Sequence, residues 1–168
     1  YQLTASGLAE QINSGYSIFH FAGHGNSTSI LMEQGANFSV KEASSLKNNA
    51  VGVILSSSCY INSFDRTDPC LSEAFMRNPY GGCVAFWGSA REAWGLPDIS
   101  ENLGPSYLFN AKFLENLYKE GQAERTYSFA ALCSNAKANI SGNSAIAGAY
   151  WFLQYSLNAM GDPELPIY

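Results

Sequence analysis

The chain has 168 residues and a mass of 18.2 kDa, a length that predicts one domain or a large part of one. Hydrophobic residues make up 46% of the chain, which excludes a disordered polymer, and charged residues make up only 14%, so uncharged polar side chains must cover much of the surface. The net charge of −5 argues against a nucleic-acid partner and against a polybasic membrane anchor. We also find no apolar run of the roughly 18 residues that a membrane-spanning segment requires.

Cysteine and histidine usage predicts neither a disulfide framework nor a metal site. The four cysteines are too few for a disulfide scaffold of this length, and no two of them have the spacing of a zinc-binding pair. The only histidines, His20 and His24, lie close together in the sequence. We therefore expect no metal and no cofactor, and we expect Cys70, Cys83 and Cys133 to fill space in the core.

The first structural signal along the chain is a set of three short apolar runs. They cover residues 16–22, 51–56 and 82–87 and are rich in β-branched or aromatic side chains. Runs of this kind are typical of strands that are buried on both faces of a parallel sheet. Around Gly35, the segment 26–38 predicts a small β-hairpin or a loop.

Helical patterns lie between and after these runs. Ser39 and Glu42 form a capping-box pattern, and Pro69 and Pro79 bracket another helix. The expected helices cover residues 4–13, 39–48, 67–77, 106–120, 124–139 and 144–158. Because strands and helices alternate through the first half of the chain, the sequence predicts an α/β fold with a mostly parallel sheet.

Two of the predicted strands end in residues that suggest chemistry. The first runs into His24 and Gly25, and the second runs into Cys59. Since the carboxyl ends of neighbouring parallel strands meet at one edge of the sheet, we expect the imidazole and the thiol to emerge side by side. A thiol beside an acid–base group can act as a nucleophile, and the main-chain N–H groups of Gly25 and Cys59 can stabilise an oxyanion.

A structural interpretation of the same residues stands beside the catalytic one. A cysteine at the end of a strand is commonly a small buried hydrophobic residue, and a single histidine commonly has a packing role. His20 lies four residues before His24, within the predicted strand, and we expect it to be packed. The residues alone leave both interpretations open.

An ordered set of motifs resembles the gingipain family of cysteine peptidases, peptidase family C25, in the caspase-like clan CD. Residues 20–27 resemble its His-Gly motif, and residues 53–62 resemble the motif around its catalytic cysteine. The other resembling segments, in the order of the family, are 69–77, 81–89 with Trp94, and 160–165.

The resemblance implies a caspase-like α/β fold with a Cys–His dyad. Cys59 would be the nucleophile, and His24 would polarise the scissile amide and protonate the leaving amine. The main-chain amides of Gly25 and Cys59 would form the oxyanion hole. The activity implied is that of a cysteine endopeptidase acting on a peptide or protein substrate, with cleavage after Lys or Arg.

The resemblance also implies a specificity pocket. Trp94 would form a wall of the S1 pocket, and Asp98, four residues later, would contact a cationic substrate side chain. Asp98 can equally be a solvated loop carboxylate, and Glu92 is a rival acid for the same role.

The chain departs from the family in having only 23 residues before His24. In the family, an acid that orients the histidine and several strands come from sequence upstream of that motif. We therefore expect residues 1–168 to form a peptidase catalytic domain lacking its N-terminal strands, with an upstream chain or pro-region completing the sheet. The family implies a secreted or cell-surface protein. Two alternatives remain, a sortase-like transpeptidase of the same family and a catalytically inactive caspase-like interaction module.

Overall fold

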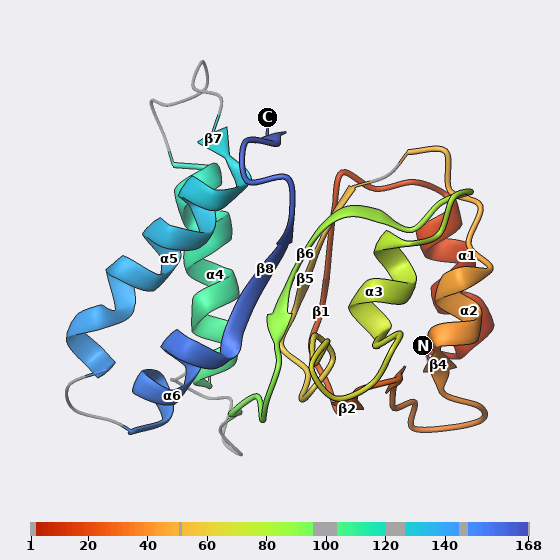
Figure 1. The fold of residues 1–168 in the computed structure, drawn as a ribbon, viewed down its shortest axis with the longest axis horizontal. Helices are drawn as coiled ribbons and strands as arrows, with labels where there is room; N and C mark the ends of the chain where they lie inside the picture. Colours follow the sequence, from red (N-terminus) through yellow and green to blue (C-terminus); the bar gives the residue numbers. More distant parts are fainter. Residues whose placement is uncertain (1–2, 51, 96–103, 120–126, 145–147, 168) are drawn as a thin grey trace.

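The computed structural model describes residues 3–50, 52–95, 104–119, 127–144 and 148–167. A four-stranded sheet lies at the centre, with the order β1-β5-β6-β8 (Figure 1). β1, β5 and β6 are mutually parallel, and β8 pairs antiparallel with β6. The strands are β1 (Ile18–Phe21), β5 (Gly52–Ser56), β6 (Cys83–Ser89) and β8 (Leu157–Gly161). This confirms the expected α/β class with a mostly parallel sheet.

Helices cover both faces of the sheet. The first three helices lie on one side and the last three on the other (Figure 1). One layer consists of α1 (Ala5–Asn13), α2 (Val40–Ser44) and α3 (Leu71–Met76). The other consists of α4 (Pro105–Leu117), α5 (Phe129–Ser144) and α6 (Gly148–Ser156).

Alternating side chains of the central strands divide the core into two layers. Ile54 and Phe86 pack among the residues of α1, α2 and α3. Val53, Leu55 and Trp87 point to the other face and pack against α4, α5 and α6. Because both faces of β5 and β6 are covered, these strands read as continuous apolar runs in the sequence.

The segment 26–38 forms part of a small sheet, as the sequence suggested. β2 (Gly25–Asn26), β3 (Ser29–Ile30) and β4 (Phe38–Ser39) pair antiparallel in that order. Asn26 accepts hydrogen bonds from the main-chain N–H and the hydroxyl of Thr28, which closes the turn between β2 and β3. A further short pair joins β7 (Tyr127–Ser128) to β9 (Pro166–Ile167).

Several helix boundaries differ from the sequence-based expectation. α2 has the predicted capping box but ends at Ser44, and α3 begins at Leu71, where Glu73 accepts from the main-chain N–H of Cys70. α5 begins at Phe129, after β7. The prediction that a helix extends to residue 158 is wrong, because the chain leaves α6 at Ser156 and enters β8.

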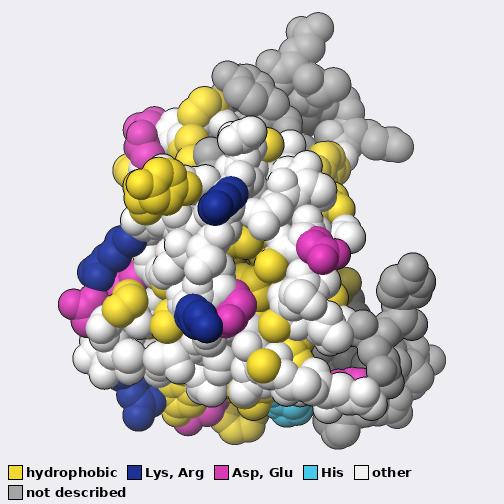
Figure 2. Space-filling view, turned by 90° about the vertical axis from the view of Figure 1, so that its right-hand side faces the viewer, with side chains coloured by type: hydrophobic (Ala, Val, Ile, Leu, Met, Phe, Trp, Pro, Cys, Tyr) yellow, Lys and Arg dark blue, Asp and Glu magenta, His cyan; other side chains and the backbone are white. Residues whose placement is uncertain are grey.

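The surface carries few charges, as the composition requires. Figure 2 shows scattered charged groups in a surface that is mainly uncharged polar side chains and backbone. The described ion pairs are all formed by partly or largely exposed cations, for example Arg77 with Asp68 and Lys112 with Glu115. Within the described residues, no helix combines the length and apolar character needed to traverse a bilayer.

Candidate active site

The ends of β1 and β5 bring the two candidate catalytic segments to one edge of the sheet. Phe21 pairs with Ser56, and the Ser57 main-chain N–H donates to the Phe21 carbonyl oxygen over 3.0 Å. The chain therefore leaves both strands at the same level. His24 follows β1 by three residues, and Cys59 follows β5 by three residues.

Gly25 lies against the main chain of the cysteine segment. A Cβ atom at this position would stand 3.0 Å from Ser58 Cβ and 3.2 Å from the Cys59 carbonyl oxygen. Both contacts are tighter than ordinary van der Waals distances, so any side chain here would press on the backbone that carries Cys59. The glycine thus allows the segment after β1 to approach the segment after β5.

A left-handed residue follows the cysteine directly. Tyr60 has a φ of 58°, a conformation that costs a non-glycine residue of order 1–3 kcal/mol. The turn is held by the Tyr60 main-chain N–H, which donates to the Arg91 carbonyl oxygen over 2.8 Å. The Tyr60 hydroxyl donates to Glu92, and the Arg66 guanidinium lies 4.7 Å from the centre of the ring. These contacts fix a sharp turn with Cys59 at its start.

The Cys59 thiol is free and half-buried, and the main chain of Ala93 contacts it. The main-chain N–H of Ala93 donates to the sulfur over 3.3 Å, and the sulfur lies 3.6 Å from the Ala93 carbonyl oxygen. Among the described residues, no hydrogen bond joins the thiol to the imidazole of His24. The structure thus places the two segments together, while the thiol itself faces the segment after β6.

The His24 side chain is exposed beside a separate hollow. This cavity of about 330 Å³ is also lined by Phe21, Leu31, Met32 and other residues near β3. The His24 carbonyl oxygen accepts from the Leu31 main-chain N–H over 2.9 Å, which fixes the backbone on both sides of β2. The imidazole has no hydrogen-bond partner among the residues that the structure describes.

The predicted specificity residues are only partly within the described chain. Trp94 is 49% exposed, and its carbonyl oxygen accepts from the Ser106 main-chain N–H. Glu92 accepts from the Tyr60 hydroxyl, so it is tied to the turn after the cysteine. Asp98 lies outside the described residues.

His20 belongs to a polar cluster between the sheet and α4. Its Nε2 atom lies 3.4 Å from Ser57 Oγ and 3.2 Å from Asn110 Nδ2, and the Asn110 amide donates to Ser57 Oγ over 2.7 Å. The Tyr107 ring meets the imidazole edge-on at 5.6 Å. Burial lowers the pKa of His20, so this packed imidazole favours its neutral form. The cluster agrees with the expectation that His20 is packed.

The remaining cysteines lie in the core, as expected. Cys70, Cys83 and Cys133 are buried and free, and burial raises the pKa of each thiol. In the described ranges, His, Cys, Asp and Glu side chains form no group of three or more that could hold a metal ion. Asp162 accepts from the Glu164 main-chain N–H over 2.9 Å and so caps a turn.

Sequence reasoning missed the residues that hold the site in place. The left-handed turn at Tyr60 and the contact of Ala93 with the sulfur have no local sequence signal. Asn110 joins His20 across 90 positions of the chain, and nothing in the sequence around either residue indicates it.

Comparison with known proteins decides the family. The family model described as Peptidase family C25 matches residues 1–168. The chain belongs to peptidase family C25. No curated protein matches the chain.

Solved structures of the same fold include cysteine proteinases. The Arg-specific cysteine proteinase gingipain R superposes with a TM-score of 0.79 at 21% identity, covering 98% of this chain and 36% of that one. The complex of Porphyromonas gingivalis RgpB pro- and mature domains gives a TM-score of 0.75 at 20% identity, with 97% and 37% coverage. A structure described as a protease gives 0.68 at 16% identity, with 97% and 38% coverage. The chain therefore has the gingipain fold and spans a little over a third of these proteins.

Proposed function

We propose that this C25-family chain carries the catalytic dyad of a cysteine endopeptidase, with Cys59 as nucleophile and His24 as acid–base group. The main-chain N–H groups of Gly25 and Cys59 form the oxyanion hole of this proposal. Trp94 and Asp98 form the S1 pocket, and cleavage follows Lys or Arg.

One observation carries the proposal: the segments that hold His24 and Cys59 leave neighbouring parallel strands at the same edge, with Gly25 against the Cys59 backbone. Ligands of open α/β sheets bind beyond the carboxyl ends of the strands, which is where both residues lie. Two further features support it. The thiol is half-buried rather than in the core, and the turn at Tyr60 is strained, as is common at functional sites.

The reaction proceeds through a thioester. The Cys59 thiol gives its proton to His24, and the resulting thiolate attacks the scissile carbonyl carbon. The electrons of the carbonyl double bond move to its oxygen, which accepts from the Gly25 and Cys59 N–H groups. When the C–N bond breaks, His24 gives its proton to the leaving amine. Water then attacks the thioester and transfers a proton to His24. The C–S bond breaks, the acid product leaves, and His24 returns the proton to the Cys59 sulfur.

The proposal also covers the strands that would pair with β1 and the location of the protein. Among the described strands, β1 pairs only with β5, so its other edge is open. We infer that an upstream part of the protein, or a pro-region, adds strands to this edge, since an unpaired edge favours association. Slower amide exchange along β1 in the full-length protein than in residues 1–168 would support this. The family favours a secreted or cell-surface location, which fractionation of the producing cell tests.

A specific contact favours a second candidate function, that of a catalytically inactive caspase-like interaction module. The Cys59 sulfur is engaged by the Ala93 main chain, and His24 is not bonded to it.

The sortase-like alternative differs only in the acceptor of the acyl group. An added amine nucleophile distinguishes it, because a transpeptidase forms the new amide and a hydrolase forms the acid.

The deciding experiment labels the full-length protein with a lysine-containing peptidyl acyloxymethyl ketone under reducing conditions. We expect one adduct at Cys59, its loss in Cys59→Ala, and its retention in the matched variant Cys133→Ala, whose thiol is buried. His24→Ala should lower kcat by about 10²–10⁴-fold on a cleavable peptide. Normal turnover by Cys59→Ala refutes the peptidase, and absence of any adduct favours the inactive module.

The S1 assignment is tested separately on peptides that end in Lys or in a neutral residue at the cleavage position. Asp98→Asn should lose the preference for Lys while neutral peptides change less. Glu92→Gln is the comparison variant, because Glu92 bonds to Tyr60. A Lys preference that survives Asp98→Asn removes this residue from the site.

A further inference from the structure

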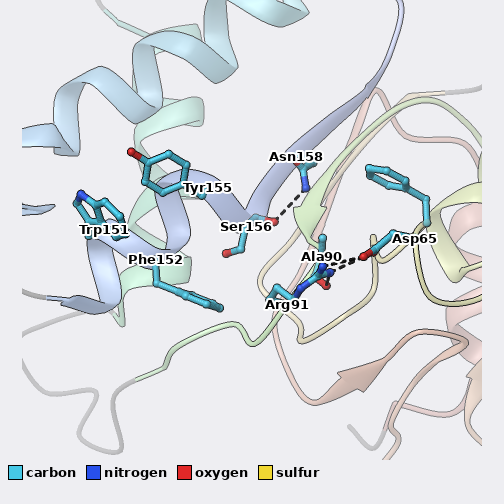
Figure 3. A pocket seen from close by; sticks show the side chains of 9 residues that line it. Asp65, Ala90, Arg91, Trp151, Phe152, Tyr155, Ser156 and Asn158 are labelled. Atoms are coloured by element: carbon cyan, nitrogen blue, oxygen red, sulfur yellow. Dashed lines mark hydrogen bonds and ion pairs between the residues drawn. The ribbon is translucent and has the colours of Figure 1, made fainter.

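A second cavity lies next to the segment that contacts Cys59. It has a volume of about 460 Å³ and lies between α6, the end of β6 and the segment after Cys59 (Figure 3). This is within the size range of protein ligand sites. Its principal lining side chains are Phe64, Asp65, Arg91, Trp151, Phe152 and Tyr155.

Aromatic side chains dominate the cavity and remain largely exposed. Phe64 is 50% exposed, Trp151 57% and Tyr155 68%, and the rings of Trp151 and Tyr155 lie 4.7 Å apart. Figure 3 shows Phe152 reaching from the same helix toward Arg91. Exposed aromatic residues that gather around a hollow are typical of binding sites.

The charges in this cavity are already paired. Arg91 makes two hydrogen bonds to the Asp65 carboxylate, at 2.7 and 3.0 Å (Figure 3). Each group neutralises the other, so the cavity offers no free charge to a ligand. Its chemistry fits a neutral, apolar occupant.

The cavity and the candidate active site share one stretch of chain. Ala90 and Arg91 line it, while Ala93, two residues later, contacts the Cys59 sulfur. The Tyr60 main-chain N–H is bonded to the Arg91 carbonyl oxygen, which joins the two sites through one turn. Because Tyr60 directly follows Cys59 and Arg91 lines the cavity, a peptide bound at Cys59 lies beside one wall of the cavity.

We propose that this cavity is a substrate subsite that binds an aromatic side chain a few residues from the scissile bond. The inference rests on the proposed function, because the occupant belongs to a peptide placed at Cys59. Trp151 and Tyr155 are its specificity residues.

The test measures binding rather than turnover, using the full-length protein with Cys59→Ala. Fluorescent peptides carry Lys at the cleavage position and either Phe or Ala at each other position in turn, and anisotropy gives their Kd values. We expect one position at which Phe binds about tenfold or more tightly than Ala, the effect of burying one large apolar side chain.

Adding Trp151→Ala or Tyr155→Ala should weaken binding of the Phe peptide by about tenfold and change the Kd of the Ala peptide much less, so that the preference is lost. Tyr80→Ala is the matched control, because Tyr80 is 75% exposed and precedes the first residue of β6, whereas Ala90 and Arg91 of the cavity follow its last residue. The proposal is overturned if no position prefers Phe, if the preference survives both substitutions, or if they weaken both peptides equally. If the ketone probe does not label Cys59 but the preference for Phe is found, the peptidase is overturned, and the cavity stands only as a binding site for an aromatic side chain.

Discussion

Asn62 joins the segment after Cys59 to β6 and β8 through hydrogen bonds of its side chain. Replacing it with Leu tests how much these bonds stabilise the protein. The residue is fully buried. Its amide donates to the Asn158 carbonyl oxygen over 3.0 Å and to Gly88 over 3.4 Å, and its Oδ1 accepts from the Ser72 hydroxyl over 2.6 Å. Leucine has a similar size, so Asn62→Leu removes these bonds without opening a large cavity.

The expected loss of stability follows from the quality of each bond. The 3.4 Å bond to Gly88 is long and contributes little. The other two are good bonds, and a buried group left without its partner costs about 1–3 kcal/mol. In the variant the Ser72 hydroxyl can still form hydrogen bonds with the sulfur atoms of Cys70 and Met160. The cost of losing its bond to Asn62 therefore lies at the low end of this range. We expect Asn62→Leu to lower the free energy of unfolding by about 2–4 kcal/mol.

Denaturant unfolding followed by circular dichroism measures this change, with the midpoint lowered and the m-value unchanged. Asn139→Leu is the matched control, because Asn139 is exposed on α5 and its amide makes one bond, to Asn116. That variant should stay within about 0.5 kcal/mol of the parent protein. Equal effects of the two substitutions would refute the role given to Asn62.

Three further predictions concern other parts of the molecule. Gly82→Ala should lower the free energy of unfolding by about 3 kcal/mol or more, because φ at this position is +89° and the new Cβ would collide with the Phe75 carbonyl oxygen. Gly35→Ala is the control, because its φ is +80° but no atom lies within 4 Å of the new Cβ, so it should cost only about 1–2 kcal/mol. Thermal unfolding measures both changes. Because burial lowers the folded-state pKa of His20, the free energy of unfolding should fall as pH drops from the unfolded pKa of 6.5 through the folded pKa. In His20→Gln the free energy of unfolding should depend less on pH over this range. The same pH dependence in both proteins would contradict the burial argument. Raising NaCl from 0.02 to 0.5 M should change the free energy of unfolding by less than about 1 kcal/mol, because each described ion pair has at least one well-exposed partner. A larger loss would indicate a buried charge network.

Local signals predicted the central elements of the fold. The runs that became β1, β5 and β6 are apolar because the sheet is covered on both faces, and this pattern is visible without tertiary information. The capping box at Ser39 and Glu42 also acts within one turn of chain, and the structure contains both of its hydrogen bonds. Features of this kind are encoded by neighbours in the sequence.

β8 and the residues around Cys59 depend on partners far along the chain. Leu157–Gly161 follows α6 without a helix-stopping residue, and it becomes a strand because β6 offers a free edge for antiparallel pairing. The contact of Ala93 with Cys59 likewise joins segments 34 positions apart. Such pairings have no local pattern, so the sequence identifies the cysteine but not what holds it.

The low charge of the chain explains how the candidate site is built. The main chain of the turn after Cys59 is held by neutral groups: the Tyr60 N–H on the Arg91 carbonyl, the Asn62 amide on Asn158, and the Ser63 hydroxyl on the Tyr60 carbonyl over 2.6 Å. The charged groups of Glu92 and Arg66 contact only the Tyr60 side chain. Neutral hydrogen bonds of buried groups are not screened by salt, whereas exposed ion pairs are. Because the turn depends on the first kind, its geometry should remain fixed over a range of ionic strength. Any salt dependence of peptide binding would then arise from the charge of the substrate and not from rearrangement of the segment that carries Cys59.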